Sequence, residues 1–188
     1  MTQAISRARS KVYEYACCNE WQYFITLTVN GELLDRSDLE GYHKALTYFL
    51  KNKNRRRPMP IRYVLVPELH NDRKNWHMHG LVMGLTSQDL CTNINGYLSW
   101  PDYTERFGFC SLSPIKSHQA VSKYILKYIG KGFQDRRVGE HLYYCSRGLK
   151  TAEHMGTGFL LKEPEWDYQN KYVAVKWLDK AFERYVSL

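Results

Sequence analysis

The sequence predicts an α+β fold in which helices pack against an antiparallel β-sheet. Runs rich in β-branched and aromatic residues alternate with stretches whose apolar residues recur at helical spacing, in the order β-α-β-β-α-β-α-β. Two successive strand-like runs are separated by one short polar turn, which is the pattern of a hairpin. No repeat or linker interrupts the 188 residues. We therefore expect one domain over residues 1–188, with an N-terminal arm to about residue 20 and a C-terminal extension from about residue 160.

The first strand and the first helix have the clearest patterns. Residues 23–29 are β-branched and aromatic and end in Asn30-Gly31, which predicts a strand followed by a turn. Apolar residues at helical spacing predict a helix over residues 37–52, with Ser37 as the N-cap and Glu40 completing a capping box.

The hairpin comes next. Residues 61–69 and 76–83 are predicted strands, and the polar turn at 71–75 joins them. The later elements are expected as a helix over 86–100 capped by Ser87 and stopped by Pro101, a strand over 107–112, a helix over 117–131, a strand over 142–146, and a helix from Asp167 onward.

Composition favours a polyanionic partner. Lys and Arg number 27 against 19 Asp and Glu, which gives a net charge of +8 and a pI near 9.2. A membrane is the weaker choice, because no apolar run approaches about 18 residues. The five cysteines are scattered without a C-x-x-C pair, as in reduced cytoplasmic proteins. We therefore expect a cytoplasmic protein that binds nucleic acid and no membrane.

Two groups of basic residues are candidates for contacts to DNA phosphates. Arg55, Arg56 and Arg57 lie in a basic loop after the first predicted helix, and Arg147 and Lys150 lie farther along the chain. A solvated charge run is an equal alternative for the loop. The 15 tyrosines and five tryptophans offer rings on which unpaired bases can stack, although most of them are expected in the core.

Two histidines on the hairpin are candidate metal ligands. His77 and His79 are two residues apart on a predicted strand, so both side chains point to one face. Glu68 and His70 have the same relation on the partner strand. Two imidazoles with the Glu68 carboxylate suit Mg²⁺ or Mn²⁺, whereas His70 in its place gives an all-histidine set that favours zinc. Glu68 is the preferred third ligand and His70 the alternative.

A tyrosine–lysine stripe accompanies these ligands. Tyr124, Lys127, Tyr128 and Lys131 fall within a sector of about 100° on the predicted helix, away from its main apolar stripe. A tyrosine phenol is a weak nucleophile at its ordinary pKa of about 10, and a nearby lysine or divalent ion favours the phenolate. Metal ligands, phenols and cations together are the equipment for attacking a phosphodiester.

At these residues the chain resembles the HUH endonucleases that initiate rolling-circle replication. Phe24-Ile25-Thr26-Leu27-Thr28 is similar to the family's first motif, and His77-Met78-His79 to its His-hydrophobe-His signature. Glu68-Leu69-His70 stands upstream like the ligand-bearing segment of single-stranded DNA virus initiators. Tyr124 and Lys127 match the third motif, and the repeat at Tyr128 and Lys131 looks most like initiators of small phages and some plasmids.

The resemblance implies a metal-dependent DNA nickase that also rejoins strands. It implies a ferredoxin-like or RRM-like sheet of about five strands flanked by helices, with Mg²⁺ or Mn²⁺ held by Glu68, His77 and His79. Tyr124 would attack the phosphate to give a 5′-phosphotyrosine link and a free 3′-OH, and Tyr128 would attack in a later round. Tyr128 is the alternative main nucleophile, but the surroundings of Tyr124 match the single-tyrosine pattern more closely.

The resemblance also implies the partners. Single-stranded or hairpin origin DNA would be the substrate, in the cytoplasm of a prokaryotic host of a plasmid or virus. No G-x-x-x-x-G-K-[ST] loop is present, so no helicase domain is expected, and the host would supply the helicase and polymerase.

Other functions remain alternatives at the level of sequence. An HUH transposase or a conjugative relaxase would carry the same motifs, so only the DNA substrate separates them from an initiator. A non-catalytic α+β domain that binds nucleic acid would explain the charge and the aromatic residues. It would leave the convergence of Glu68, His77 and His79 with the tyrosine–lysine stripe unexplained.

Overall fold

The computed structural model describes residues 3–94, 96–117, 124–125, 141–154, 165–166, 168–169, 171 and 174–175. Its helices are α1 (Gln3–Cys18), α2 (Leu39–Asn54) and α3 (Pro101–Phe107), with a 3₁₀ turn at Ser87–Asp89. Its strands are β1 (Tyr23–Thr28), β2 (Arg62–Leu69), β3 (Trp76–Met83), β4 (Cys91–Thr92), β5 (Leu98–Ser99), β6 (Cys110–Pro114), β7 (Tyr144–Cys145), β8 (Tyr168–Gln169) and β9 (Ala174–Val175).

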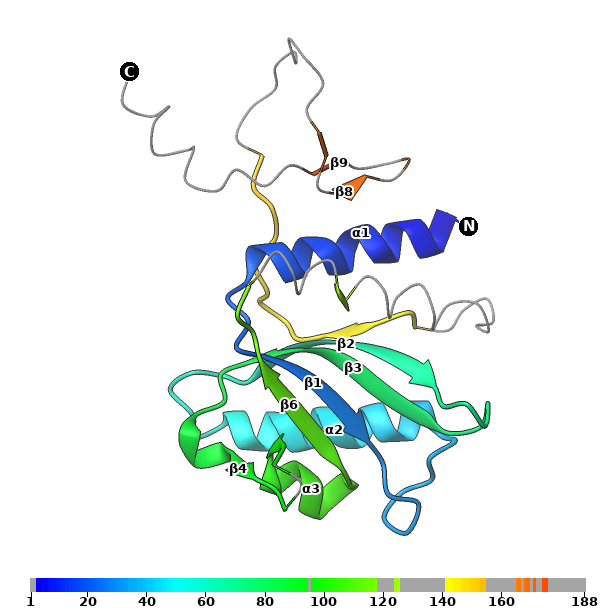
Figure 1. Cartoon of the computed structure of the whole chain (residues 1–188), viewed down its shortest axis with the longest axis vertical. Helices are drawn as coiled ribbons and strands as arrows, with labels where there is room; N and C mark the ends of the chain where they lie inside the picture. The colour runs from blue at the N-terminus through cyan, green and yellow to red at the C-terminus, as the bar shows by residue number, and fades with distance from the viewer. Residues whose placement is uncertain are drawn as a thin grey trace.

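The predicted α+β class is confirmed, with a larger sheet than expected. Seven strands form one sheet in the order β4-β5-β6-β1-β3-β2-β7, and all of their pairings are antiparallel. The sequence predicted about five strands because β4 and β5 have only two residues each, too few for a periodic pattern. The pair β8-β9 forms a separate small sheet on the far side of α1 (Figure 1).

Both faces of the sheet are covered by helix. Helices α2 and α3 lie on one side and α1 on the other (Figure 1). On the α2 side, Tyr42, Leu46 and Phe49 share a core with strand residues such as Ile25 and Met78. Because neighbouring strand residues point to opposite faces, the residues between them form the second core under α1.

Helix α1 occupies the segment that the sequence marked only as an N-terminal arm. Ala8, Val12 and Ala16 recur every four residues along it and pack against Val64 and Leu81. The stripe is narrow and made mostly of small side chains, so it is a weak signal among the surrounding basic residues. The packing against the sheet stabilises the helix, because an isolated helix of this length is marginal in water.

The helix predicted over 86–100 is wrong. The chain instead makes the turn at Ser87–Asp89, the short strands β4 and β5, and then α3. Asp89 accepts hydrogen bonds from the backbone N–H and the hydroxyl of Thr86, which closes the first turn early. Pro101 starts α3 instead of stopping a helix, since a proline at the first helical position loses no hydrogen bond. The strand expected over 107–112 shifts to β6 for the same reason.

Two further expectations are corrected. Helix α2 begins after Asp38, whose side chain accepts a hydrogen bond from the N–H of Gly41 at 2.8 Å. Ser37, the predicted cap, donates to Asp35, and Glu40 pairs with Lys44. In the C-terminal extension, the predicted helix is contradicted at β8 and β9, which form a hairpin. Within the helix predicted over 117–131, Tyr124 and Ile125 are helical, and residues 118–123 and 126–131 lie outside the described residues.

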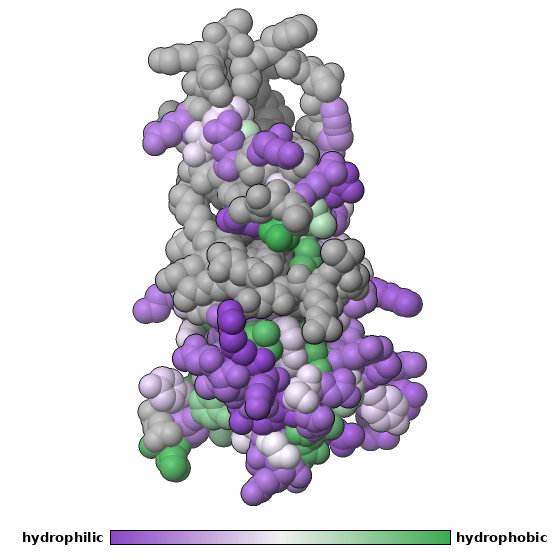
Figure 2. Space-filling view, turned by 90° about the vertical axis from the view of Figure 1, so that its right-hand side faces the viewer, coloured by the Kyte–Doolittle hydropathy of each residue, from purple (hydrophilic) through white to green (hydrophobic). Residues whose placement is uncertain are grey.

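The half of the molecule that contains the sheet, α2 and α3 presents mostly hydrophilic side chains in the view of Figure 2. Among the described residues, no helix is long and apolar enough to cross a membrane.

Candidate functional site

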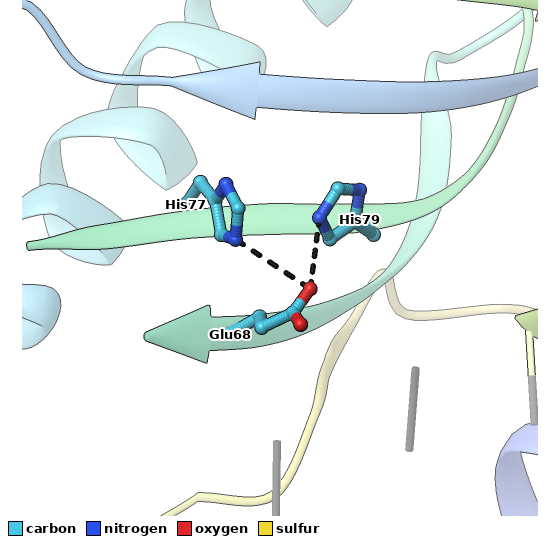
Figure 3. Close-up of side chains that lie close together, drawn as sticks. All are labelled: Glu68, His77 and His79. Atoms are coloured by element: carbon cyan, nitrogen blue, oxygen red, sulfur yellow. Dashed lines mark ion pairs between the residues drawn. The ribbon is translucent and has the colours of Figure 1, made fainter. Parts of the chain in front are cut away.

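The β2–β3 hairpin brings the three predicted metal ligands together. Glu68 pairs with His77 in the register, and Val66 pairs with His79, so all three ligands lie on one face. Oε2 of Glu68 is 3.0 Å from Nε2 of His79 and 3.5 Å from Nε2 of His77 (Figure 3). One ligand atom from each residue lies within 4.8 Å of the others. The strand phase that the sequence predicted therefore produces a compact set of two imidazoles and a carboxylate.

The set fits a divalent cation. Among the described residues, no hydrogen-bond partner reaches the buried Nε2 of His77, and 3.5 Å to Glu68 is longer than an ordinary hydrogen bond. Burial lowers the pKa of His77, and burial together with the nearby His77 lowers the pKa of His79 to about 3. Both imidazoles are therefore neutral at physiological pH, the state in which they donate a lone pair to a metal.

A threonine of the neighbouring strand orients His79. Thr26 faces His79 across the β1–β3 ladder, and its Oγ1 lies 3.1 Å from Nδ1 of His79. With Nδ1 bonded to Thr26, Nε2 is left to face Glu68 and a metal. The sequence left open whether Thr26 has this role or only fills the strand.

The alternative ligand His70 lies outside the converging set. Its side chain is 47% exposed, and its Nδ1 is 3.9 Å from Asp72. Its ring centroid lies 5.7 Å from that of His77, beyond the end of β2. The geometry therefore favours Glu68 as the third ligand.

Tyr124 lies on the same face of the sheet as the ligands. Its ring packs edge-on against Phe24 at 5.0 Å between centroids, and Phe24 stacks with His79 at 6.2 Å. Tyr124 is 44% exposed, whereas the adjacent Ile125 is buried in the core under α1. Ile125 thus anchors the turn on the sheet while the phenol faces outward, one ring away from a candidate ligand. The other predicted catalytic residues, Lys127, Tyr128 and Lys131, lie outside the described residues.

Arg36 is a cation at the site that sequence reasoning missed. Its backbone carbonyl accepts a hydrogen bond from the N–H of Trp76 at 2.9 Å, which ties its loop to the start of β3 beside His77. The positive charge of Arg36 contributes to the lowered pKa of His77. Its Nε is buried without a hydrogen-bond partner among the described residues. The sequence around Arg36 matches no motif, so its position became visible only in the folded loop.

The predicted DNA-binding residues have different surroundings. Arg55, Arg56, Arg147 and Lys150 are exposed. The guanidinium of Arg57 instead donates to both carboxylate oxygens of Asp89, at 2.7 and 2.6 Å, and to the carbonyl of Gly84. Arg57 therefore also joins the end of α2 to the turn at Ser87–Asp89.

Comparison with known proteins identifies the family. No curated protein and no solved structure gives a significant match to the chain. A family model does match, that of the ORF2-type Replication-associated protein, over residues 22–133. The match spans more than half of the chain and includes β1, both strands of the hairpin and Tyr124. Its range takes in the ligand set and the candidate nucleophile together, and the chain belongs to this family of replication-associated proteins, which serve rolling-circle replication.

Proposed function

We propose that this protein is an HUH-type initiator that nicks and rejoins single-stranded origin DNA to start and end rolling-circle replication. The observation that carries the proposal is the convergence of Glu68, His77 and His79 on the face that also presents Tyr124. Membership of a replication-associated family supports an initiator over a transposase or a relaxase. It also supports a catalytic protein over a purely DNA-binding domain.

Glu68, His77 and His79 would hold Mn²⁺ or Mg²⁺. Bound there, the ion supplies positive charge to the oxygens of the scissile phosphate and makes its phosphorus more electrophilic. Thr26 holds the ring of His79 in the orientation that this requires. Arg36 adds a fixed positive charge beside the same phosphate, which a guanidinium recognises through paired hydrogen bonds.

Tyr124 is the proposed nucleophile. Its phenolic oxygen forms a bond to phosphorus as the bond from phosphorus to O3′ breaks, and the proton lost by the phenol is balanced by the one that O3′ gains. The products are a 5′-phosphotyrosine link and a free 3′-OH that a polymerase can extend. Because the link retains the energy of the phosphodiester, a later 3′-OH can reverse the step and close a circle.

The remaining predicted residues take supporting roles in the proposal. Lys127 and Lys131 stabilise the phenolate and the phosphate charge, and Tyr128 attacks in a later round. Arg55, Arg56, Arg57, Arg147 and Lys150 contact DNA phosphates. The host supplies helicase and polymerase, and the protein acts in the cytoplasm of a prokaryote that carries the plasmid or virus.

The test is formation of a covalent protein–DNA adduct. The protein is incubated with single-stranded origin DNA and Mn²⁺, with EDTA as the control, and the adduct is resolved on a denaturing gel. We expect Tyr124→Phe to abolish the adduct and the matched variant Tyr128→Phe to retain it. His77→Ala should lose cleavage but keep its affinity for DNA, because the ligand set acts on the phosphate and not on the rest of the strand.

Three outcomes would count against the proposal. An undiminished adduct in Tyr124→Phe moves the nucleophile to Tyr128. Loss of DNA affinity along with cleavage in His77→Ala makes the metal structural. No adduct with any origin strand, for a wild-type protein that binds Mn²⁺, removes the nickase.

A further inference from the structure

A groove of about 960 Å³ lies at the β7 edge of the sheet, between α2 and the residues around β7. His43, Thr47 and Lys51 line it from α2, and Tyr144 lines it from β7. Tyr144 pairs with Leu65, which belongs to the core on the α2 side. The main part of the groove is thus on the opposite face of the sheet from Glu68 and His79, so it is separate from the metal centre.

The groove is positively charged. Lys51, Arg62 and Arg147 line it, and among its described lining residues there is no Asp or Glu. Lys51 and Arg147 are exposed, and Arg62 is half-buried, with its guanidinium donating to the carbonyl of Gly148. Cations in a concave surface without compensating acids attract an anion, because the low-dielectric walls focus the potential.

Three aromatic rings stand beside these cations. The rings of His43 and Tyr144 stack with their centroids 3.7 Å apart and an interplanar angle of 16°. The exposed ring of His141 lies 5.6 Å from that of Tyr144. Burial and the nearby His141 lower the pKa of His43, so its ring is neutral and serves stacking more than charge. Planar rings next to cations match the two parts of a nucleotide, its base and its phosphate.

We propose that this groove binds a second stretch of the single-stranded DNA substrate, with phosphates against Lys51, Arg62 and Arg147 and an unpaired base against the rings of His43, Tyr144 and His141. The proposal rests on the proposed function, because it names a second binding surface for the same substrate. The groove retains the strand while the chemistry proceeds on the other face of the sheet. A nickase that must rejoin the strand later benefits from holding it at two places.

The experiment measures binding without cleavage. A fluorescein-labelled single-stranded oligonucleotide is titrated with the protein in EDTA, and anisotropy gives Kd at several salt concentrations. Lys51→Ala/Arg147→Ala should weaken binding and reduce the slope of log K against log salt by about 0.7 for each phosphate that the variant no longer neutralises. His141→Ala should raise Kd about fivefold or more, as expected when one base loses its stacking partner.

Lys44→Ala is the matched control, since Lys44 is also an exposed lysine of α2 but does not line the groove. It should change neither quantity. Lys51, Arg147 and His141 are exposed, and equal melting temperatures of all variants will show that the fold is intact.

If Lys51→Ala/Arg147→Ala and His141→Ala match Lys44→Ala in Kd and salt slope, the proposal is wrong. ATP is titrated in parallel as a free nucleotide. Loss of ATP binding with unchanged oligonucleotide binding would assign the groove to a small nucleotide and overturn the proposal as well. Failure of the nickase is seen separately, because it is read from the adduct of the wild-type protein and not from these Kd values.

Discussion

The side chains of the metal centre place three acceptors close together in a poorly solvated position. The Glu68 side chain is 20% exposed and that of His79 is 10% exposed. A carboxylate and two neutral imidazoles that share a small volume gain little from one another without a cation, and burial of such groups carries a cost. A divalent ion bound at their common point would offset that cost, which is why we interpret the cluster as functional.

Thr26 should tune the affinity of this site. Thr26→Val keeps the shape and β-branching of the side chain but removes Oγ1, so the His79 ring loses its orienting hydrogen bond. We expect the Kd for Mn²⁺, measured by calorimetry, to rise about tenfold, as for other partners that orient a ligand. Thr26→Ser should restore the affinity. Equal Kd values for Thr26→Val and the wild type would show that Thr26 only fills the strand.

Glu68 and His70 can be separated by the same measurement. Glu68→Gln removes the ligand charge at nearly constant volume, so Mn²⁺ affinity should fall by more than about 100-fold, beyond the loss expected for an orienting partner. His70→Ala should leave it unchanged, because the His70 ring is half-exposed beside Asp72. The reverse result would make His70 the third ligand.

At the scale of the element, the cap of α2 offers a direct comparison. Asp38→Ala removes the acceptor for the N–H of Gly41 and should cost about 1 kcal/mol in the free energy of unfolding, measured with urea. Ser37→Ala is the control and should cost much less, since Ser37 bonds only to Asp35 in an exposed turn. A larger loss in Ser37→Ala would return the cap to the position that the sequence predicted.

At the scale of the whole molecule, the Arg57–Asp89 ion pair joins α2 to the segment that follows the hairpin. The hydrogen bonds from Arg57 hold the pKa of the Asp89 carboxyl well below its ordinary value, although partial burial opposes this. The unfolded chain therefore takes up a proton at higher pH than the folded protein does. This contribution to stability is present above about pH 4, the unfolded pKa, and is lost as the pH falls through the folded pKa.

Asp89→Asn should reveal that dependence. The difference in unfolding free energy between wild type and Asp89→Asn is expected to be largest near pH 7 and to shrink progressively below about pH 4. Urea unfolding across this range measures it. A difference that stays constant with pH would mean that the pair contributes no charge-dependent stability.

The proposed activities occupy two sides of one sheet. The ligands and Tyr124 lie on the face under α1, near the end of the hairpin, and most of the basic groove lies on the α2 face at the β7 edge. A sheet covered on both faces can present different chemistry at each, because alternate residues of the same strand point in opposite directions.

The sequence alone determined the features that depend on backbone periodicity. The strand repeat of two residues placed His77 and His79 on one face, and the turn at 71–75 set the hairpin so that Glu68 joined them. The predicted strands over 61–69 and 76–83 agree with β2 and β3 within one residue.

The tertiary structure decided what depends on packing between distant segments. Helix α1 is stabilised by residues of β2 and β3, Tyr124 meets His79 only through Phe24, and the groove joins α2 to β7. Local periodicity states which way a side chain points. It does not state what covers that face, because this depends on the packing of residues that are far apart along the chain.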